Sequence, residues 1–325
     1  MRVIKAVTSL MLTTGVVALM SLLVGTFSIS VSDALRALAG QGDPSSILVI
    51  QGLRLPRIVD AVLVGLALGV SGAIFQELMH NPLASPDILG VESGAAMGAV
   101  IAIVASGGQT LAVAGGAVIG GLTATFAVYM LSSADRSVSG YRLTLVGVST
   151  AAALTSVTSY LLTHASINQA QQAATWLSGS LSGRSMADVY PVALALVVMS
   201  PALCVLGPQL GVLQLGDKTA LGLGASVESG RRALLVTAAV LAAAATASAG
   251  PVLFVALVAP PLAKWLARTS TANLLLAGLV GAALVCAGDV SGRLLAAPSE
   301  LPVGVMTAIA GAPVLLWLLH RSGVS

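Results

Sequence analysis

The chain has 325 residues, of which 57% are apolar and only 8% are charged, with 15 basic and 12 acidic side chains. A soluble domain carries about 25% charged residues, so this composition excludes most soluble enzymes, and its apolar content excludes a disordered chain. The remaining class is a protein that crosses a membrane several times. In that class, a net charge of +3 reflects Lys and Arg in cytoplasmic loops rather than a nucleic-acid surface.

Charged residues divide the N-terminal half into apolar segments. Residues 6–32 carry no charge and predict a first span. This run is longer than a signal-peptide core, so we expect it to be retained, with cleavage at Ala37-Leu38-Ala39 as the alternative. Residues 93–134 are also uncharged and as a helix would extend about 63 Å, twice a ~30 Å hydrocarbon core. They predict two spans that separate at Gly107-Gly108-Gln109.

Two interruptions set the spans of the C-terminal half. The polar tract 164–175 ends a fifth span near residue 163, and Ala249-Gly250-Pro251 divides the uncharged segment 233–263, because proline removes a helix hydrogen bond. Short outer helices are expected at 33–39 and 179–189. The sequence therefore predicts an all-α polytopic membrane protein, a single domain over 1–325 with ten transmembrane helices at about 6–27, 58–79, 88–106, 110–131, 143–163, 189–207, 233–249, 251–266, 272–290 and 303–320.

The basic residues predict the orientation of these spans. With both termini in the cytoplasm, ten Lys and Arg residues fall in cytoplasmic segments and five fall outside, and all three lysines are among the ten. This bias satisfies the positive-inside rule. Merging two spans would invert every downstream loop and remove the agreement.

The source of energy for a transporter of this kind lies outside the chain or in an ion gradient. The sequence contains no GxxxxGK[ST] phosphate loop, and its nearest string, 216–219, has Asp217 where glycine must precede the lysine. The longest cytoplasmic loop, 208–232, is rich in glycine, and Asp217 or Thr219 is expected to cap a short helix there. This loop is either a contact for a separate ATPase or an ordinary solvated linker.

Ionisable residues near the middle of a span would favour an ion-gradient carrier. The candidates here lie near span ends, where Arg57 with Asp60 and Asp289 with Arg293 form possible helical pairs. The histidines do not share the i,i+4 spacing of a metal site. We therefore expect no metal site and no catalytic residues, and an ion-coupled secondary transporter is the alternative function.

Several strings carry a family resemblance. The segments RLPR (54–57) and GVSGAIFQELMHNPLASPDILGVESGAAMG (69–98) resemble the FecCD family of ABC importer permeases, which serve iron-siderophore, haem and vitamin B12 uptake. Four more segments match in the same order, namely ATWLSGSLSGRSMADV (174–189), LGDKTALGLG (215–224), AGPVLFVALVAPPLAKWL (249–266) and ELPVGVMTAIAGAP (300–313). The strings are most similar to those of ferric-siderophore permeases, with haem or vitamin B12 as the alternative cargo.

The resemblance implies an assembly rather than a lone chain. It implies a type II ABC importer permease fold in the bacterial cytoplasmic membrane, paired with a second permease chain that is identical or related. Two ATPase subunits would bind ATP and magnesium, and a periplasmic or lipid-anchored binding protein would deliver the ferric siderophore. The chain itself would be no enzyme, would hold no cofactor and would bind no nucleic acid.

The resemblance also implies functional residues. Arg54, Arg57 and Arg293 match arginines that meet glutamates of the binding protein in the vitamin B12 relative, with local pairing as the alternative. The cytoplasmic gate of relatives corresponds loosely to Ser139, Gly140 and Tyr141, and Pro261 stands where the family commonly has histidine. The ATPase contact maps onto 211–230, with matching positions at Leu215, Gly216, Asp217, Thr219, Ala220, Leu221, Gly222 and Gly224.

Overall fold

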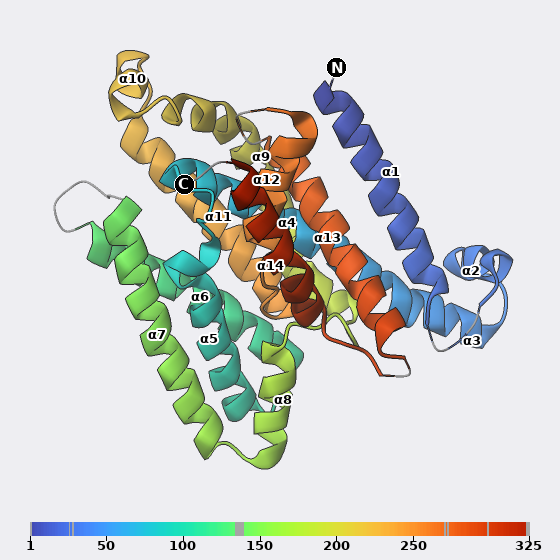
Figure 1. Ribbon diagram of the computed structural model, residues 1–325. Coiled ribbons are helices and arrows are strands. Elements are labelled where there is room, and N and C mark those ends of the chain that lie inside the picture. Colours follow the sequence, from blue (N-terminus) through green and yellow to red (C-terminus); the bar gives the residue numbers. More distant parts are fainter. Residues whose placement is uncertain are drawn as a thin grey trace.

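The computed structural model describes residues 2–25, 27, 29–133, 140–269, 271, 273–297 and 299–322, and every regular element in them is helical (Figure 1). The all-α prediction is confirmed for this part of the chain. The helices are α1 (Arg2–Leu23), α2 (Val31–Leu38), α3 (Pro44–Ile47), the π-helical η1 (Leu48–Arg54), α4 (Leu55–Met79), the 3₁₀ turn η2 (Pro86–Leu89), α5 (Val91–Ser106), α6 (Thr110–Ser132), α7 (Gly140–His164), α8 (Ile167–Leu177), α9 (Met186–Leu213), α10 (Asp217–Gly222), α11 (Val227–Ala249), α12 (Val255–Ala267), α13 (Leu274–Leu295) and α14 (Val303–Ser322).

Seven helical stretches in the described residues are long and apolar enough to cross a membrane. They include α1, α6, α7, α9, α11 and α13, and one continuous stretch of α3, η1 and α4. Three of the ten predicted spans coincide instead with shorter apolar helices, α5, α12 and the 303–318 part of α14. Length and composition therefore establish a multi-span chain.

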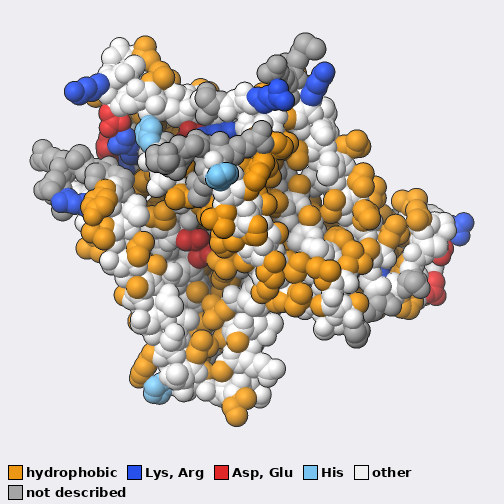
Figure 2. Space-filling model, in the orientation of Figure 1, with side chains coloured by type: hydrophobic (Ala, Val, Ile, Leu, Met, Phe, Trp, Pro, Cys, Tyr) orange, Lys and Arg blue, Asp and Glu red, His pale blue; other side chains and the backbone are white. Residues whose placement is uncertain are grey.

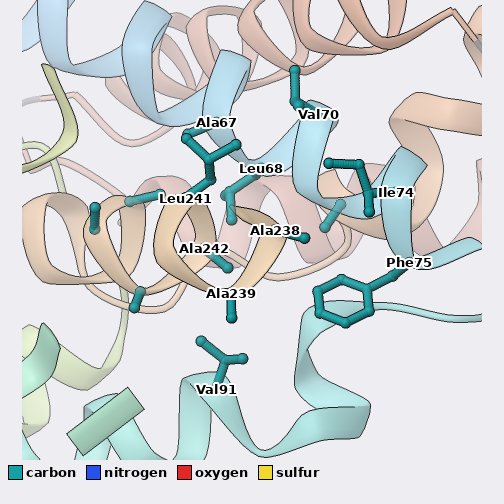
Figure 3. Close-up of a cluster of buried hydrophobic side chains, with 14 of the residues drawn as sticks. Ala67, Leu68, Val70, Ile74, Phe75, Val91, Ala238, Ala239, Leu241 and Ala242 are labelled. Atoms are coloured by element: carbon teal, nitrogen blue, oxygen red, sulfur yellow. The ribbon is translucent and has the colours of Figure 1, made fainter. Parts of the chain in front are cut away.

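The centre of the bundle is α4 packed against α11. Figure 3 shows Leu68, Ile74 and Phe75 of α4 facing Ala238 and Ala242 of α11, all within one buried cluster. Small side chains on α11 allow the two helices to approach closely, as in other membrane helix pairs.

Glycine permits the same close approach on another side of α4. A Cβ atom added at Gly72 would lie 1.9 Å from the carbonyl oxygen of Ala256 in α12, so only glycine fits. With partners on several sides, α4 is, together with α11, the most enclosed of the long helices in the described residues.

The outside of the bundle is apolar. In Figure 2, hydrophobic side chains are spread over the whole visible face among backbone and other side chains, while Lys and Arg side chains lie mainly along the upper edge and at the far right. The exposed residues include large side chains such as Leu12, Ile119 and Leu194. Such a surface suits a lipid environment.

The structure differs from the prediction in the polar tract and around α9. The tract 164–175 is mostly helix α8, which Ser166 and Gln169 begin with a reciprocal capping box and which buries Trp176. The expected helix at 179–189 is wrong, because the chain turns there and α9 begins at Met186. Helix α9 also continues through Pro208 to Leu213, since membrane helices tolerate internal proline. The short helix expected at 33–39 is confirmed by α2.

The predicted break after Ala249 is present and is longer than expected. Helix α11 ends at Ala249, and α12 begins only at Val255. Gly250 and Phe254 both have positive φ, at +77° and +66°, so the backbone reverses between the helices rather than kinking at proline alone.

Candidate functional site

The segment between α9 and α11 forms a small helical projection around α10, at the top left of Figure 1. Gly216 precedes α10 with φ of +91°, a conformation that L side chains rarely adopt. Ala220 is fully buried and holds α10 against the bundle, whereas Leu215 and Leu221 are exposed. Asp217, Thr219, Gly222 and Gly224 are exposed as well, so this projection presents apolar and small residues for contact.

Neither Asp217 nor Thr219 caps α10, so the capping prediction is wrong. The helix begins at Asp217 itself with Gly216 in the capping position, and its first turn has no side-chain cap. The carboxylate of Asp217 instead accepts a hydrogen bond from Arg231 Nη2 of α11, with a distance of 2.7 Å between Nη2 and Oδ1. One exposed ion pair therefore joins the projection to the bundle.

A cavity of about 310 Å³ lies beneath the start of α10. Gly216 and Asp217 form one wall, and Met79 and His80 at the end of α4 contribute another. Leu143, near the start of α7, also lines it. A displacement of α10 would therefore meet side chains of both α4 and α7.

Two of the three residues matched to a gate, Gly140 and Tyr141, lie at the start of α7. Ser139 lies outside the described residues, and Gly140 is the first residue of α7. Tyr141 is 80% exposed, and its ring is therefore available to a neighbouring chain or to the pathway.

A group of five charged residues, the arginine cluster, lies at the C-terminal end of α1. Its members are Arg54, Arg57, Asp289, Arg293 and Glu300. Arg54 is buried, with Nη1 2.5 Å from the Leu22 carbonyl oxygen and Nη2 bonded to the Phe27 carbonyl. Arg293 is also buried and donates to the carbonyl oxygens of Ser21 and Val24 at 3.1 and 2.8 Å. Both arginines thus satisfy carbonyls that the end of α1 leaves without helical partners.

Arg57 connects the buried and exposed parts of the arginine cluster. Its Nε and Nη2 atoms lie 2.8 and 2.7 Å from Oδ1 of Asp289, which is 3% exposed and also pairs with Arg293 at 3.0 Å. Its Nη1 atom lies 2.7 Å from Oε2 of Glu300, which is 37% exposed. Partial burial alone would raise the pKa of Glu300, but the hydrogen bond and charge of Arg57 outweigh burial and lower that pKa.

The expected helical pair of Asp289 with Arg293 is confirmed, but the pairing of Arg57 with Asp60 is wrong. Asp60 is fully buried and accepts a hydrogen bond from Ser248 of α11, and Ser248 also contacts the carbonyl oxygen of Asp188 at 2.6 Å. Arg57 therefore pairs with Asp289, 232 positions further along the chain, and not with Asp60 on its own helix.

Asp87 and Glu92 form a second pair of carboxyl groups near the α10 end. Asp87 was not among the residues predicted from the sequence. Asp87 of η2 is hydrogen-bonded to Glu92 of α5 and lies 3.5 Å from the Ser85 hydroxyl. Burial raises the pKa of Asp87, although both hydrogen bonds oppose that effect. Two carboxyl groups this close favour sharing a proton. Gly90, with φ of +69°, makes the turn between Asp87 and Glu92. This glycine was the signal in the sequence that could have indicated a turn bringing the two carboxyl groups together.

Among the residues that the structure describes, no group of three or more His, Cys, Asp or Glu side chains is placed to hold a metal ion.

Comparison with known proteins identifies the kind of molecule that has this geometry. The sequence model of the FecCD transport family matches residues 12–321. The chain is 40% identical over 295 residues to the ferric enterobactin transport system permease protein FepG of Escherichia coli (strain K12), covering 91% of this chain and 89% of FepG. It is 38% identical over 281 residues to the cobalamin import system permease protein BtuC of Halobacterium salinarum (strain ATCC 700922 / JCM 11081 / NRC-1), covering 86% and 75% of the two chains.

A solved structure has the same fold along almost the whole chain. A metal-chelate type ABC transporter in an inward-facing conformation superimposes with a TM-score of 0.86 at 28% identity. The match covers 98% of this chain and 99% of that one. The helices described above are therefore arranged as in that transporter.

Proposed function

This chain belongs to the FecCD transport family, and we propose that it is the permease subunit of an ATP-driven importer for a ferric siderophore. The observation that carries this proposal is the similarity along nearly the whole chain to a ferric enterobactin permease. The missing phosphate loop supports a division of labour in which a separate ATPase supplies the energy. Haem or a corrinoid is the second candidate cargo, favoured by the similarity to a cobalamin permease.

We propose ten membrane spans in a single permease domain over 1–325, with both termini in the cytoplasm. The seven long stretches and the three shorter apolar helices supply the ten. The start of α1 and the end of α14 lie toward the same end of the bundle as α10 in Figure 1, which supports an even number of crossings. The α10 end is then cytoplasmic, and the arginine cluster faces outward in the bacterial inner membrane.

The α10 projection is the proposed ATPase contact. Its exposed leucines and glycines offer an apolar surface of the kind that a groove on a partner buries, and Ala220 anchors it to the bundle. The cavity beneath α10 borders α4 and α7. A displacement of α10 toward this cavity would therefore bring it against the start of α7. Tyr141, with Gly140 and Ser139, is the proposed gate at that point. The contact set is Leu215, Gly216, Asp217, Thr219, Ala220, Leu221, Gly222 and Gly224.

The other proposed partners follow from the same function. A second permease chain, identical or related, pairs with this one, and two ATPase subunits bind ATP and magnesium below the α10 ends. A substrate-binding protein docks on the outer end through the arginine cluster, where Arg57 is the proposed contact and the buried Arg54 and Arg293 hold the cluster in place. Arginine forms forked bonds with carboxylates, which gives such docking its register.

Reconstitution tests the proposal directly. The chain, purified with its cognate ATPase and binding protein, is placed in liposomes and supplied with a radiolabelled ferric siderophore. Uptake that requires internal ATP supports the importer. Uptake driven by an ion gradient without ATP would support the secondary transporter instead, and retention of haem or a corrinoid by the binding protein would reassign the cargo.

Deletion of 216–222 tests the coupling role of α10. The shortened chain should insert into the membrane and fold, because only Ala220 of the deleted segment is buried. ATP hydrolysis by the partner should no longer drive uptake. Normal ATP-driven uptake by the deletion variant would disprove the role of α10.

A further inference from the structure

The three arginines of the arginine cluster differ in what a partner protein can reach. Arg54 and Arg293 are buried, and their guanidinium groups are bonded to carbonyls at the end of α1. Moving either would leave those carbonyls unpaired in an apolar setting, which is costly. Arg57 alone holds a solvent-exposed partner, Glu300. The accessible part of the cluster is therefore the Arg57–Glu300 pair.

The two ion pairs of Arg57 are of unequal strength. Arg57 is 12% exposed and Asp289 is almost fully buried, and a buried pair of this kind is costly to break. Glu300 is more than one-third exposed, and pairs with such carboxylates contribute little net free energy. An incoming carboxylate would therefore displace Glu300 and leave Asp289 in place.

The charge of the cluster favours an anionic partner. Three arginines face two carboxylates, Asp289 and Glu300, so the cluster has one positive charge in excess. Arg54 donates to two carbonyl oxygens, and Arg293 Nε is buried without a hydrogen-bond acceptor among the residues that the structure describes. The excess positive charge would attract a carboxylate of a partner toward Arg57.

Glu300 also lies at a connection between helices. It stands three residues before α14 and lies near Ser182, in the turn before α9, whose hydroxyl helps to lower the pKa of Glu300. The next residue, Leu301, donates a backbone hydrogen bond to Gly292 of α13, and Gly304 donates one to Gly179, just after α8. Release of Glu300 would loosen the segment that leads into α14 while Gly304 keeps its contact with Gly179.

We propose that Glu300 is an internal latch on Arg57, and that a carboxylate of the substrate-binding protein displaces it on docking. This inference rests on the proposed importer function and deepens it, because it names Arg57 as the exchangeable contact. Docking would thus transmit a local change to the start of α14 and the turn after α8. In the free transporter, Glu300 covers Arg57 and weakens docking.

Glu300→Gln is the direct test, since it removes the charge and retains the shape. The cognate binding protein is titrated against the assembled transporter in lipid nanodiscs at low salt. Affinity should increase about two- to fivefold, the value of one exposed ion pair. Asp43→Asn is the matched control, because it removes a fully exposed carboxylate that pairs locally with Ser45, and it should leave affinity unchanged.

A second variant, Ser182→Ala, removes the other partner of Glu300 without changing any charge. It should shift affinity in the same direction by a smaller factor. Equal or weaker binding by Glu300→Gln, with normal binding by the wild type, would overturn the latch. A complete lack of binding by the wild-type complex would overturn the docking proposal, and the latch with it, and so separates the two failures.

Discussion

The two ends of the bundle hold their proposed contact residues in different ways. In the arginine cluster, two of three arginines are buried and bonded to the end of α1. At the α10 end, leucines and glycines project from the bundle, held by a buried Ala220 and one exposed ion pair. Charged residues at the first end mainly brace the fold, and apolar residues at the second end remain free for a partner.

The physical reason for this difference is the cost of unpaired backbone groups. Helix α1 ends without intrahelical partners for its last carbonyls, and near a membrane these cannot be left unsatisfied. Arginine supplies several donors in a rigid fork and serves this purpose well. Helix α10 has only six residues and lies at an exposed edge, so water can satisfy its ends.

The largest effect is expected from Arg293→Ala. The substitution leaves two carbonyls and the Ser21 hydroxyl without their donor and weakens the pairing of Asp289. Loss of one partner of a buried pair costs about 3–5 kcal/mol, so the unfolding temperature in detergent should fall strongly. Arg36→Ala, on exposed α2, is the control and should change stability by about 0.5 kcal/mol or less. Similar stability of both variants would contradict the bracing role.

The next largest effect is expected on the affinity for the ATPase rather than on stability. The double variant Leu215→Ser and Leu221→Ser removes two exposed apolar side chains from the α10 projection. Affinity for the ATPase should fall about tenfold, as expected for lost contact residues in an interface. The unfolding temperature should remain unchanged. Leu53→Ser changes an exposed leucine before α4 and serves as the control. An equal loss of ATPase binding by this variant would contradict the proposal that α10 is the ATPase contact.

The sequence predicted the course of the chain better than its contacts. Uncharged apolar runs located the long helices, because burial in lipid requires such runs. Helix α8 was missed because its composition is polar, although the capping residues Ser166 and Gln169 mark its start. The end of α9 was placed too early, at residue 207, whereas the helix continues through Pro208 to Leu213.

The partner of Arg57 could not be read from local spacing. Asp60 lies on the same helix one turn away, yet the actual partners, Asp289 and Glu300, come from the far end of the sequence. Side-chain pairing over such separations depends on how α4 and α13 pack, and spacing along one helix carries no information about that. The family strings located the α10 projection, but they did not indicate that two of the outer arginines are buried.

A smaller effect is expected from Asp217→Asn, which removes the ion pair with Arg231. Asp217 is exposed, so the pair should contribute no more than about 1 kcal/mol to stability. We expect little change in the unfolding temperature and a faster exchange of the backbone amides of α10. A destabilisation as large as that of Arg293→Ala would show that the α10 projection is braced as firmly as the arginine cluster.

The smallest effect is a pH dependence at Glu300. The groups that face its carboxylate are Arg57 of α4, the Asp289–Arg293 pair of α13, and the Ser182 hydroxyl. Because the folded-state pKa of Glu300 is lowered below 4.5, its stabilising contribution is fully present above the unfolded pKa and is lost as pH falls through the folded value. The carboxylate is partly exposed, so screening keeps this contribution below about 1 kcal/mol.

Comparison of the wild type with Glu300→Gln over pH 3 to 7 isolates that contribution, since all other carboxylates are common to both. The wild type should be slightly more stable at pH 7, and the difference should shrink as pH falls through the lowered pKa of Glu300, because the protonated side chain resembles glutamine. A difference that persists unchanged at pH 3 would show that shape rather than charge holds Glu300. The latch would then not open by exchange of one carboxylate for another.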